Sequence, residues 1–272
     1  MTSKTYTPVV MTKSGPVRGR INDGVATYLG LPYAAPPTRF ELPTYPAGWT
    51  QVRDASERGP TAPHTVRPFP NLDVVPLVGT GSDGSDGDYL RLNLWAPENA
   101  KDAPVMFWVH GGGFVVGSKD APISDGTAFA QSGVICVAIN YRMGIDGFLP
   151  VPGAPTNLGL RDMLFALRWV KNNIAAFGGD PSNVTAFGES AGAMAIANLV
   201  TSPLAKGLFR RAIHSERAWR DGPGYPGCTT TRAQARSIAG GLTRCRWLSQ
   251  CFARFRNGCA GKGRQAGIHR PA

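Results

Sequence analysis

Residues 188–192 read Gly-Glu-Ser-Ala-Gly, a G-x-S-x-G pattern in which a serine stands between two glycines. The apolar pattern before it predicts a strand at 184–187, and the pattern after it predicts a helix from 191 to about 200. A serine in this strand–turn–helix setting is a nucleophile elbow, which presents the hydroxyl at the carboxyl end of a sheet above a helix N-terminus. We therefore predict that Ser190 is a nucleophile and that side chains at 188 and 192 would collide with backbone.

Three consecutive glycines, Gly111–Gly113, follow a predicted strand at 105–109. Without Cβ atoms, such a run can turn its backbone N–H groups inward, where they stabilise the oxyanion of a tetrahedral intermediate. A glycine run by itself is more typical of a flexible turn. Together with the predicted elbow further along the chain, however, it indicates a serine hydrolase.

The elements that must position these groups alternate along the chain. Strands are predicted at 105–109, 134–139 and 184–187, and a helix is predicted at 160–177, ended by the Gly-Gly-Asp-Pro sequence at 178–181. This alternation predicts an α/β fold with a doubly wound, mostly parallel sheet. The first hundred residues are rich in Pro, Gly and Thr and predict short antiparallel strands joined by long loops.

Over about 9–213 the chain resembles the type-B carboxylesterases, the family that includes bacterial p-nitrobenzyl esterases and the cholinesterases. The resemblance implies an α/β-hydrolase fold and hydrolysis of small acyl or aryl esters through an acyl-serine intermediate, without metal or cofactor. It also implies that this chain lacks the C-terminal half of the fold. The stretches that carry the resemblance include Tyr28–Pro37, Leu92–Pro97, His110–Phe114, Asn140–Gly144, Asn157–Asp162, Asn173–Pro181, Asn183–Gly192 and Gly207–Ile213.

The resemblance also implies roles for individual residues. Ser190 is the acylated nucleophile, and the backbone N–H groups of Gly112, Gly113 and Ala191 form the oxyanion hole. Glu189, beside the nucleophile, orders water or polar groups, or is a buried structural acid. Phe114 and other aromatic residues line an apolar gorge.

The acid and the base of a catalytic triad are not identifiable from the sequence. In this fold the triad follows the order serine, acid, histidine, and the family supplies the last two from its C-terminal half. Only His269 follows a candidate acid, and it lies in a segment that we do not expect to fold. We interpret His214 as a surface residue at a strand end and His64 as a loop residue without a motif. The resemblance implies that His110, in the oxyanion loop, is a packing residue. The candidate acids after Ser190 are Glu216 and Asp221.

Charge divides the chain into two parts. The 272 residues carry a net charge of +11. Residues 1–214 hold 18 basic and 16 acidic residues, whereas residues 215–272 hold 11 basic and 2 acidic residues. The second part also has few aliphatic residues, so it cannot bury enough apolar surface to offset the entropy of ordering. We predict that 1–214 is the N-terminal part of a carboxylesterase domain and that 215–272 is a basic tail, disordered or read out of frame.

Several other functions are disfavoured. The tail cysteines Cys228, Cys245, Cys251 and Cys259 contain no C-x-x-C pair, and the loop at 82–88 lacks the spacing of a calcium loop, so no metal site is predicted. The basic tail has no nucleic-acid recognition motif, and we expect no nucleic-acid partner. The open alternatives are a catalytically impaired fragment and a non-enzymatic, cholinesterase-like binding protein.

The sequence also bears on the compartment. It has no run of 18 apolar residues and no apolar signal-peptide core near its start. The single cysteine of 1–214, Cys136, lies in a predicted buried strand, which fits a reducing compartment. We therefore expect a cytoplasmic protein without a membrane span, whose partner is a small ester substrate. The sequence does not predict the oligomeric state.

Overall fold

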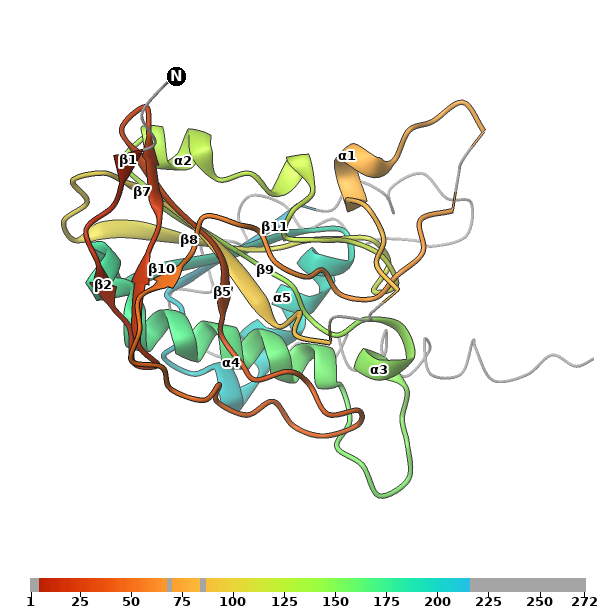
Figure 1. Cartoon of the computed structure of the whole chain (residues 1–272). Helices are drawn as coiled ribbons and strands as arrows, with labels where there is room; N and C mark the ends of the chain where they lie inside the picture. The colour runs from red at the N-terminus through yellow and green to blue at the C-terminus, as the bar shows by residue number, and fades with distance from the viewer. Residues whose placement is uncertain (1–4, 68–69, 84–86, 216–272) are drawn as a thin grey trace, which may run out of the picture. The chain divides into compact units, whose positions relative to one another are not determined.

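The computed structural model describes residues 5–67, 70–83 and 87–215. The predicted tail therefore lies outside the described residues, apart from its first residue. An eight-stranded sheet runs through the described part of the chain (Figure 1). In order across the sheet, the strands are β1 (Thr5–Tyr6), β4 (Arg20–Asn22), β5 (Val25–Pro32), β7 (Arg91–Pro97), β9 (Ile135–Ile139), β8 (Ala103–Val109), β10 (Gly179–Glu189) and β11 (Arg211–Ser215).

The sheet is mixed. Strands β9, β8, β10 and β11 run parallel to one another, as the alternating strands and helices predicted. The four N-terminal strands pair antiparallel with one another, and β7 pairs antiparallel with β9. The short antiparallel strands predicted for the first hundred residues are thus confirmed. A separate small sheet contains β2 (Val10–Met11), β3 (Pro16–Arg18) and β6 (Arg53–Asp54).

Helices cover both faces of the large sheet (Figure 1). Helix α2 (Thr127–Gln131) packs on one face, where Trp95, Trp108 and Cys136 form a small core. Helices α4 (Leu158–Asn173) and α5 (Ala191–Thr201) pack on the other face against the main core. The shorter helices are α1 (Val75–Val78) and α3 (Gly144–Phe148), and 3₁₀ turns lie at Pro122–Ser124, Ile174–Phe177 and Pro203–Ala205.

The main core explains why the central strands read as continuous apolar runs. All five residues of β9 are buried, because helices cover the sheet on both sides. The predicted helix at 160–177 is α4 followed by the 3₁₀ turn at Ile174–Phe177, and Gly178 ends it with a positive φ of 82°. None of the helices in the described ranges is long and apolar enough to cross a membrane.

Candidate active site

The elbow predicted at Ser190 is present between β10 and α5. Strand β10 ends at Glu189 and α5 begins at Ala191, so Ser190 alone makes the turn. Its backbone has φ 51° and ψ −120°, a conformation that residues with a side chain rarely adopt. Backbone bonds hold this conformation: the Ser190 N–H donates to Ser215 O at 3.1 Å, and Ser190 O accepts from Met194 N at 3.0 Å. The strained turn is thus fixed by both neighbouring elements.

The two glycines of the elbow are required by close backbone approach. A Cβ at Gly188 would lie 2.6 Å from the carbonyl carbon of Gly192. A Cβ at Gly192 would lie 2.8 Å from His110 O, at the end of the neighbouring strand β8. Both distances are far inside van der Waals contact, so the predicted collision is confirmed.

The glycine run after β8 lies directly against this elbow. A Cβ at Gly111 would lie 3.2 Å from Ser190 Cβ and 2.9 Å from Glu189 O. Gly112 and Gly113 have positive φ values of 102° and 64°, which turn the loop back on itself. No hydrogen bond among the described residues uses the N–H of Gly112 or Gly113. The structure therefore brings the predicted oxyanion loop and the predicted nucleophile together.

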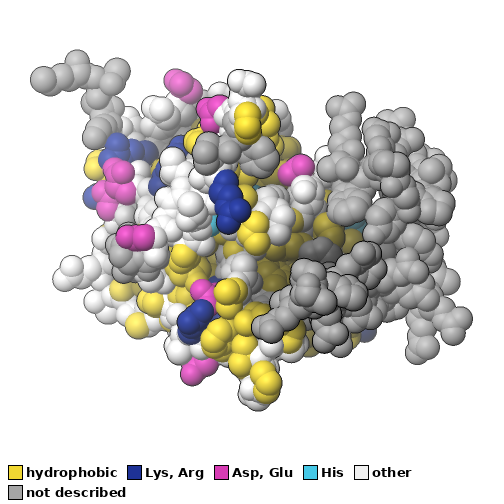
Figure 2. All heavy atoms as spheres, turned by 90° about the vertical axis from the view of Figure 1, so that its right-hand side faces the viewer, with side chains coloured by type: hydrophobic (Ala, Val, Ile, Leu, Met, Phe, Trp, Pro, Cys, Tyr) yellow, Lys and Arg dark blue, Asp and Glu magenta, His cyan; other side chains and the backbone are white. Residues whose placement is uncertain are grey.

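Glu189 is half-buried at the end of β10, with its carboxylate against Gly111. This position agrees with either of the two roles expected for it, and its role stays a prediction. Phe114, directly after the glycines, has a positive φ of 63° and packs on Phe148 of α3 with ring centroids 4.7 Å apart. Nearby positions on the loop and α3 carry exposed apolar side chains, and Figure 2 shows hydrophobic side chains gathered on the face where α3 lies. The exposed residues are Val115, Ile145 and Leu149.

Two of the histidines considered from the sequence are buried and neutral. His110 Nδ1 lies 2.9 Å from Gly111 O, and because a carbonyl only accepts, the ring proton is on Nδ1. Burial lowers the pKa of His110 to about 4, although this hydrogen bond opposes the shift. His64 makes the same kind of bond, to Ala62 O at 2.8 Å, and burial also lowers its pKa. Neither ring is held by a carboxylate in the described part of the chain.

His214 lies on β11, beside the elbow and at the edge of the sheet that the described residues form. It is in register with Gly188, two residues before Ser190. Its side chain is exposed, although partial desolvation by surrounding atoms lowers its pKa. No hydrogen bond joins His214 to Ser190 or to a carboxylate among the described residues. The remaining triad candidates, Glu216, Asp221 and His269, lie outside the described residues.

A buried ion pair beside the site was not predicted from the sequence. Arg142 Nη2 lies 2.6 Å from Asp162 Oδ1, Nε lies 2.9 Å from Oδ2, and both side chains are almost fully buried. Burial raises the pKa of the Asp162 carboxyl, and the guanidinium opposes the shift. Arg142 Nη1 also donates to Glu41 O at 2.6 Å. The pair thus joins the segment after β9 to α4 and to the N-terminal loop.

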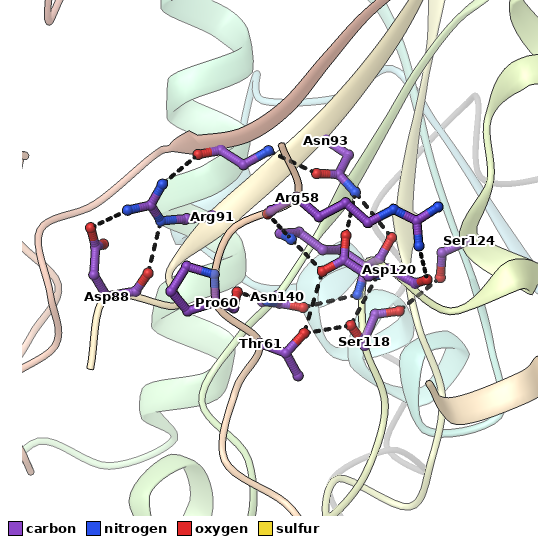
Figure 3. A network of polar contacts seen from close by, with 12 residues as sticks. Arg58, Pro60, Thr61, Asp88, Arg91, Asn93, Ser118, Asp120, Ser124 and Asn140 are labelled. Atoms are coloured by element: carbon purple, nitrogen blue, oxygen red, sulfur yellow. Dashed lines mark hydrogen bonds and ion pairs between the residues drawn. The ribbon is translucent and has the colours of Figure 1, made fainter. Parts of the chain in front are cut away.

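A second polar network anchors the loop that follows Gly111–Gly113 (Figure 3). Lys119, 1% exposed, donates from Nζ to Arg58 O at 2.7 Å and to Asp120 Oδ2 at 2.6 Å. Asn93 Nδ2 donates to Asp120 Oδ1 at 2.8 Å, and the Lys119 N–H donates to Asn140 Oδ1 at 2.9 Å. Burial lowers the pKa of Lys119 to about 8. These bonds fix Lys119 and Asp120 to β7, to the residue after β9 and to the loop at Arg58.

The mixed sheet, the strand–serine–helix elbow and the glycine loop opposite it define an α/β-hydrolase. The profile of the carboxylesterase family matches residues 6–218, and the chain belongs to this family. It is 43% identical over 240 residues to the para-nitrobenzyl esterase of Bacillus subtilis, covering 85% of this chain and 46% of that protein. It is also 43% identical over 212 residues to the phenmedipham hydrolase of Pseudarthrobacter oxydans, covering 76% of this chain and 42% of that protein.

Solved structures agree with the sequence comparisons. A thermophilic PNB esterase superposes with a TM-score of 0.68 at 41% identity, covering 85% of this chain and 47% of that one. The chain thus spans about half the length of the relatives it matches. Among the described residues, no group of three or more His, Cys, Asp or Glu side chains could hold a metal ion.

Proposed function

We propose that the protein is a serine carboxylesterase that hydrolyses esters through an acyl intermediate on Ser190. One observation carries the proposal: Ser190 stands in a strained turn, at φ 51°, directly against the glycine loop. Strain of this kind persists only where the surrounding structure fixes it, and it is concentrated at functional sites. The membership of the carboxylesterase family supports the same reaction class.

The proposed chemistry uses groups from both sides of the contact. Ser190 Oγ attacks the ester carbonyl carbon, and the carbonyl oxygen becomes negatively charged. The N–H groups of Gly112, Gly113 and Ala191 stabilise this oxyanion as it forms. The C–O bond to the alcohol then breaks, and the leaving oxygen takes up the proton that Ser190 Oγ has lost. Water hydrolyses the acyl-serine to the carboxylic acid and restores the serine hydroxyl. Glu189 is proposed to order water or polar groups beside the serine.

The proposed substrates are small acyl or aryl esters, and no cofactor or nucleic-acid partner is proposed. The exposed Val115, Ile145 and Leu149 offer an apolar surface beside the glycine loop for such groups. The name of one relative, para-nitrobenzyl esterase, also refers to a benzyl ester. Phe114, next to Val115 in the sequence, packs against Phe148 of α3.

A second candidate is a catalytically impaired protein that retains the ester-binding site, or a binding relative without activity. It is favoured by the surroundings of Ser190 in the described residues, where neither a histidine nor an acid–histidine pair is hydrogen-bonded to the hydroxyl. A serine hydroxyl is a weak nucleophile without a base to accept its proton. The two candidates differ only in turnover.

We also propose a cytoplasmic location. Cys136 is the one cysteine among the described residues, and it is a buried free thiol in β9. Burial raises the pKa of this thiol to about 12, so it is protonated and unreactive at neutral pH. A fold that carries no disulfide in this part is suited to a reducing compartment.

Hydrolysis of p-nitrophenyl acetate by the full chain tests the proposed function. We expect measurable turnover in the wild type and none above background in Ser190→Ala. Ser132→Ala is the matched control, because Ser132 is an exposed serine at the end of α2 on the opposite face of the sheet. Turnover that survives Ser190→Ala would contradict the proposal, and a wild type without Ser190-dependent turnover would favour the impaired alternative.

A further inference from the structure

We propose that Tyr141 is a positioning residue of the oxyanion hole: its hydroxyl and ring hold His110, and His110 in turn fixes the peptide group that aims the Gly112 N–H. Its importance for rate rests on the proposed function, whereas its effect on the loop can be tested without turnover. Tyr141 follows β9 and is fully buried.

Tyr141 holds His110 in two ways. Its hydroxyl donates to His110 O at 3.0 Å. Its ring stacks on the His110 imidazole, with centroids 4.5 Å apart and planes inclined by 19°. One side chain thus fixes both the backbone and the ring plane of the residue that precedes the glycine run.

His110 transmits this constraint to the glycines. Its Nδ1–H donates to Gly111 O at 2.9 Å, which fixes the direction of that carbonyl. In a trans peptide the following N–H points opposite to the carbonyl, and no cis peptide occurs in the described ranges. Fixing the Gly111 carbonyl therefore fixes the Gly112 N–H, a proposed oxyanion donor.

The other side of the loop is held without Tyr141. Gly112 O accepts from the N–H groups of Val115 and Val116, each at 3.1 Å, and this turn fixes the Gly113 N–H. Phe114 O accepts from the Gly144 N–H at 2.6 Å. Loss of the Tyr141 hydroxyl should therefore disturb Gly112 more than Gly113.

Tyr33 provides a matched control for a merely structural role. It is also fully buried, and its hydroxyl donates to Asn140 O at 2.7 Å. Each Tyr→Phe change removes one buried hydroxyl and leaves one backbone carbonyl without that donor. Only Tyr141→Phe affects a carbonyl that belongs to the oxyanion loop.

The first test follows the backbone amides of Gly111–Gly113 by NMR in the wild type, Tyr141→Phe and Tyr33→Phe. We expect Tyr141→Phe to shift the Gly112 amide resonance and to lower its backbone order parameter, with smaller changes at Gly113 and none in Tyr33→Phe. Equal behaviour of the two variants would overturn the proposal. If Tyr141→Phe does not fold, His110→Phe, which keeps a stacking ring but removes the Nδ1 donor, should reproduce the Gly112 changes.

The second test uses kinetics on an oxygen ester and on its thionoester, whose sulfur accepts hydrogen bonds weakly. In Tyr141→Phe we expect kcat for the oxygen ester to fall about tenfold with KM nearly unchanged, and the preference for oxygen over sulfur to shrink. Tyr33→Phe should keep the wild-type preference. An unchanged preference in Tyr141→Phe would contradict positioning. A wild type without Ser190-dependent hydrolysis would instead refute the proposed function and leave the amide test to decide the role of Tyr141.

Discussion

Two adjacent parts of the sheet differ in how firmly they are held. At the ends of β8, β9 and β10, the residues His110, Tyr141 and Arg142 are buried and bonded, and glycines allow backbones to meet at contact distance. On β11, the next strand along, Ile213 is 51% exposed and His214 faces solvent. The described residues therefore hold the backbone of Ser190 and of the proposed oxyanion loop closely, whereas no histidine among them is hydrogen-bonded to the Ser190 hydroxyl.

Breaking the buried ion pair should have the largest effect on the firmly held part. Asp162→Asn leaves Arg142 buried without its counter-charge, which we expect to cost about 3–5 kcal/mol of the free energy of unfolding. Chemical denaturation measures this loss. The control is Asp146→Asn, since the Arg39–Asp146 pair is solvent-exposed and should contribute at most about 1 kcal/mol. Similar losses in the two variants would show that the segment after β9 is not held by the buried pair.

Acid should weaken the same region through His110. Its pKa is about 4 in the folded chain against 6.5 for an ordinary histidine, so between these values the unfolded chain binds a proton that the folded chain does not. The pKa difference corresponds to about 3 kcal/mol of the free energy of unfolding. This stability is fully present above pH 6.5 and is lost as the pH falls towards 4.

The pH dependence of unfolding in the wild type and in His110→Asn isolates this contribution. The variant retains a side-chain N–H donor but has no titrating ring. We expect the wild type to lose more stability than the variant between pH 6.5 and 4. Parallel curves would mean that the His110 ring is not buried and neutral in the folded protein.

A methyl group at Gly192 should disturb the elbow by a smaller amount. Its Cβ would lie 2.8 Å from His110 O, so strand β8 and helix α5 must separate, at a cost of about 1–3 kcal/mol. Gly48→Ala is the control, because its Cβ would be 3.4 Å from the nearest atom, Ser14 O. Thermal unfolding compares the two variants, and equal transition temperatures would argue against close packing at the elbow.

The smallest effect is expected on the exposed strand. His214 is exposed and makes no bond to Ser190, so His214→Ala should change kcat/KM for p-nitrophenyl acetate by less than about twofold. A loss of about a hundredfold or more would identify His214 as the base. Such a result would show that β11, and not only the closely held ends of β8, β9 and β10, contributes to the site.

The sequence predicted the local parts of this site well. The elbow at Ser190 follows from a short pattern whose glycines and flanking elements lie within about fifteen residues of one another, and the structure has that geometry. The helix at 160–177 was predicted as one element because its 3₁₀ end keeps nearly helical spacing. Strand β10 extends to Gly179–Glu189, beyond the apolar core at 184–187, since pairing with neighbouring strands extends it.

Long-range contacts could not be predicted. The sequence marks Tyr141, Arg142 and Asp162 only as parts of family-like stretches, because their roles depend on partners 20 or more residues away. The bond of Lys119 to Arg58 O, 61 residues away, likewise depends on how two loops meet. A charged residue that proves to be buried carries no local pattern that distinguishes it from one at the surface.

Covalent labelling of the full chain tests the central claim, that Ser190 is the nucleophile, most directly. The protein is treated with a fluorophosphonate ester, and the modified residue is located by peptide mass spectrometry. We expect a single adduct on Ser190, absent in Ser190→Ala and unchanged in Ser132→Ala. An adduct on another residue, or equal labelling of wild type and Ser190→Ala, would contradict the account.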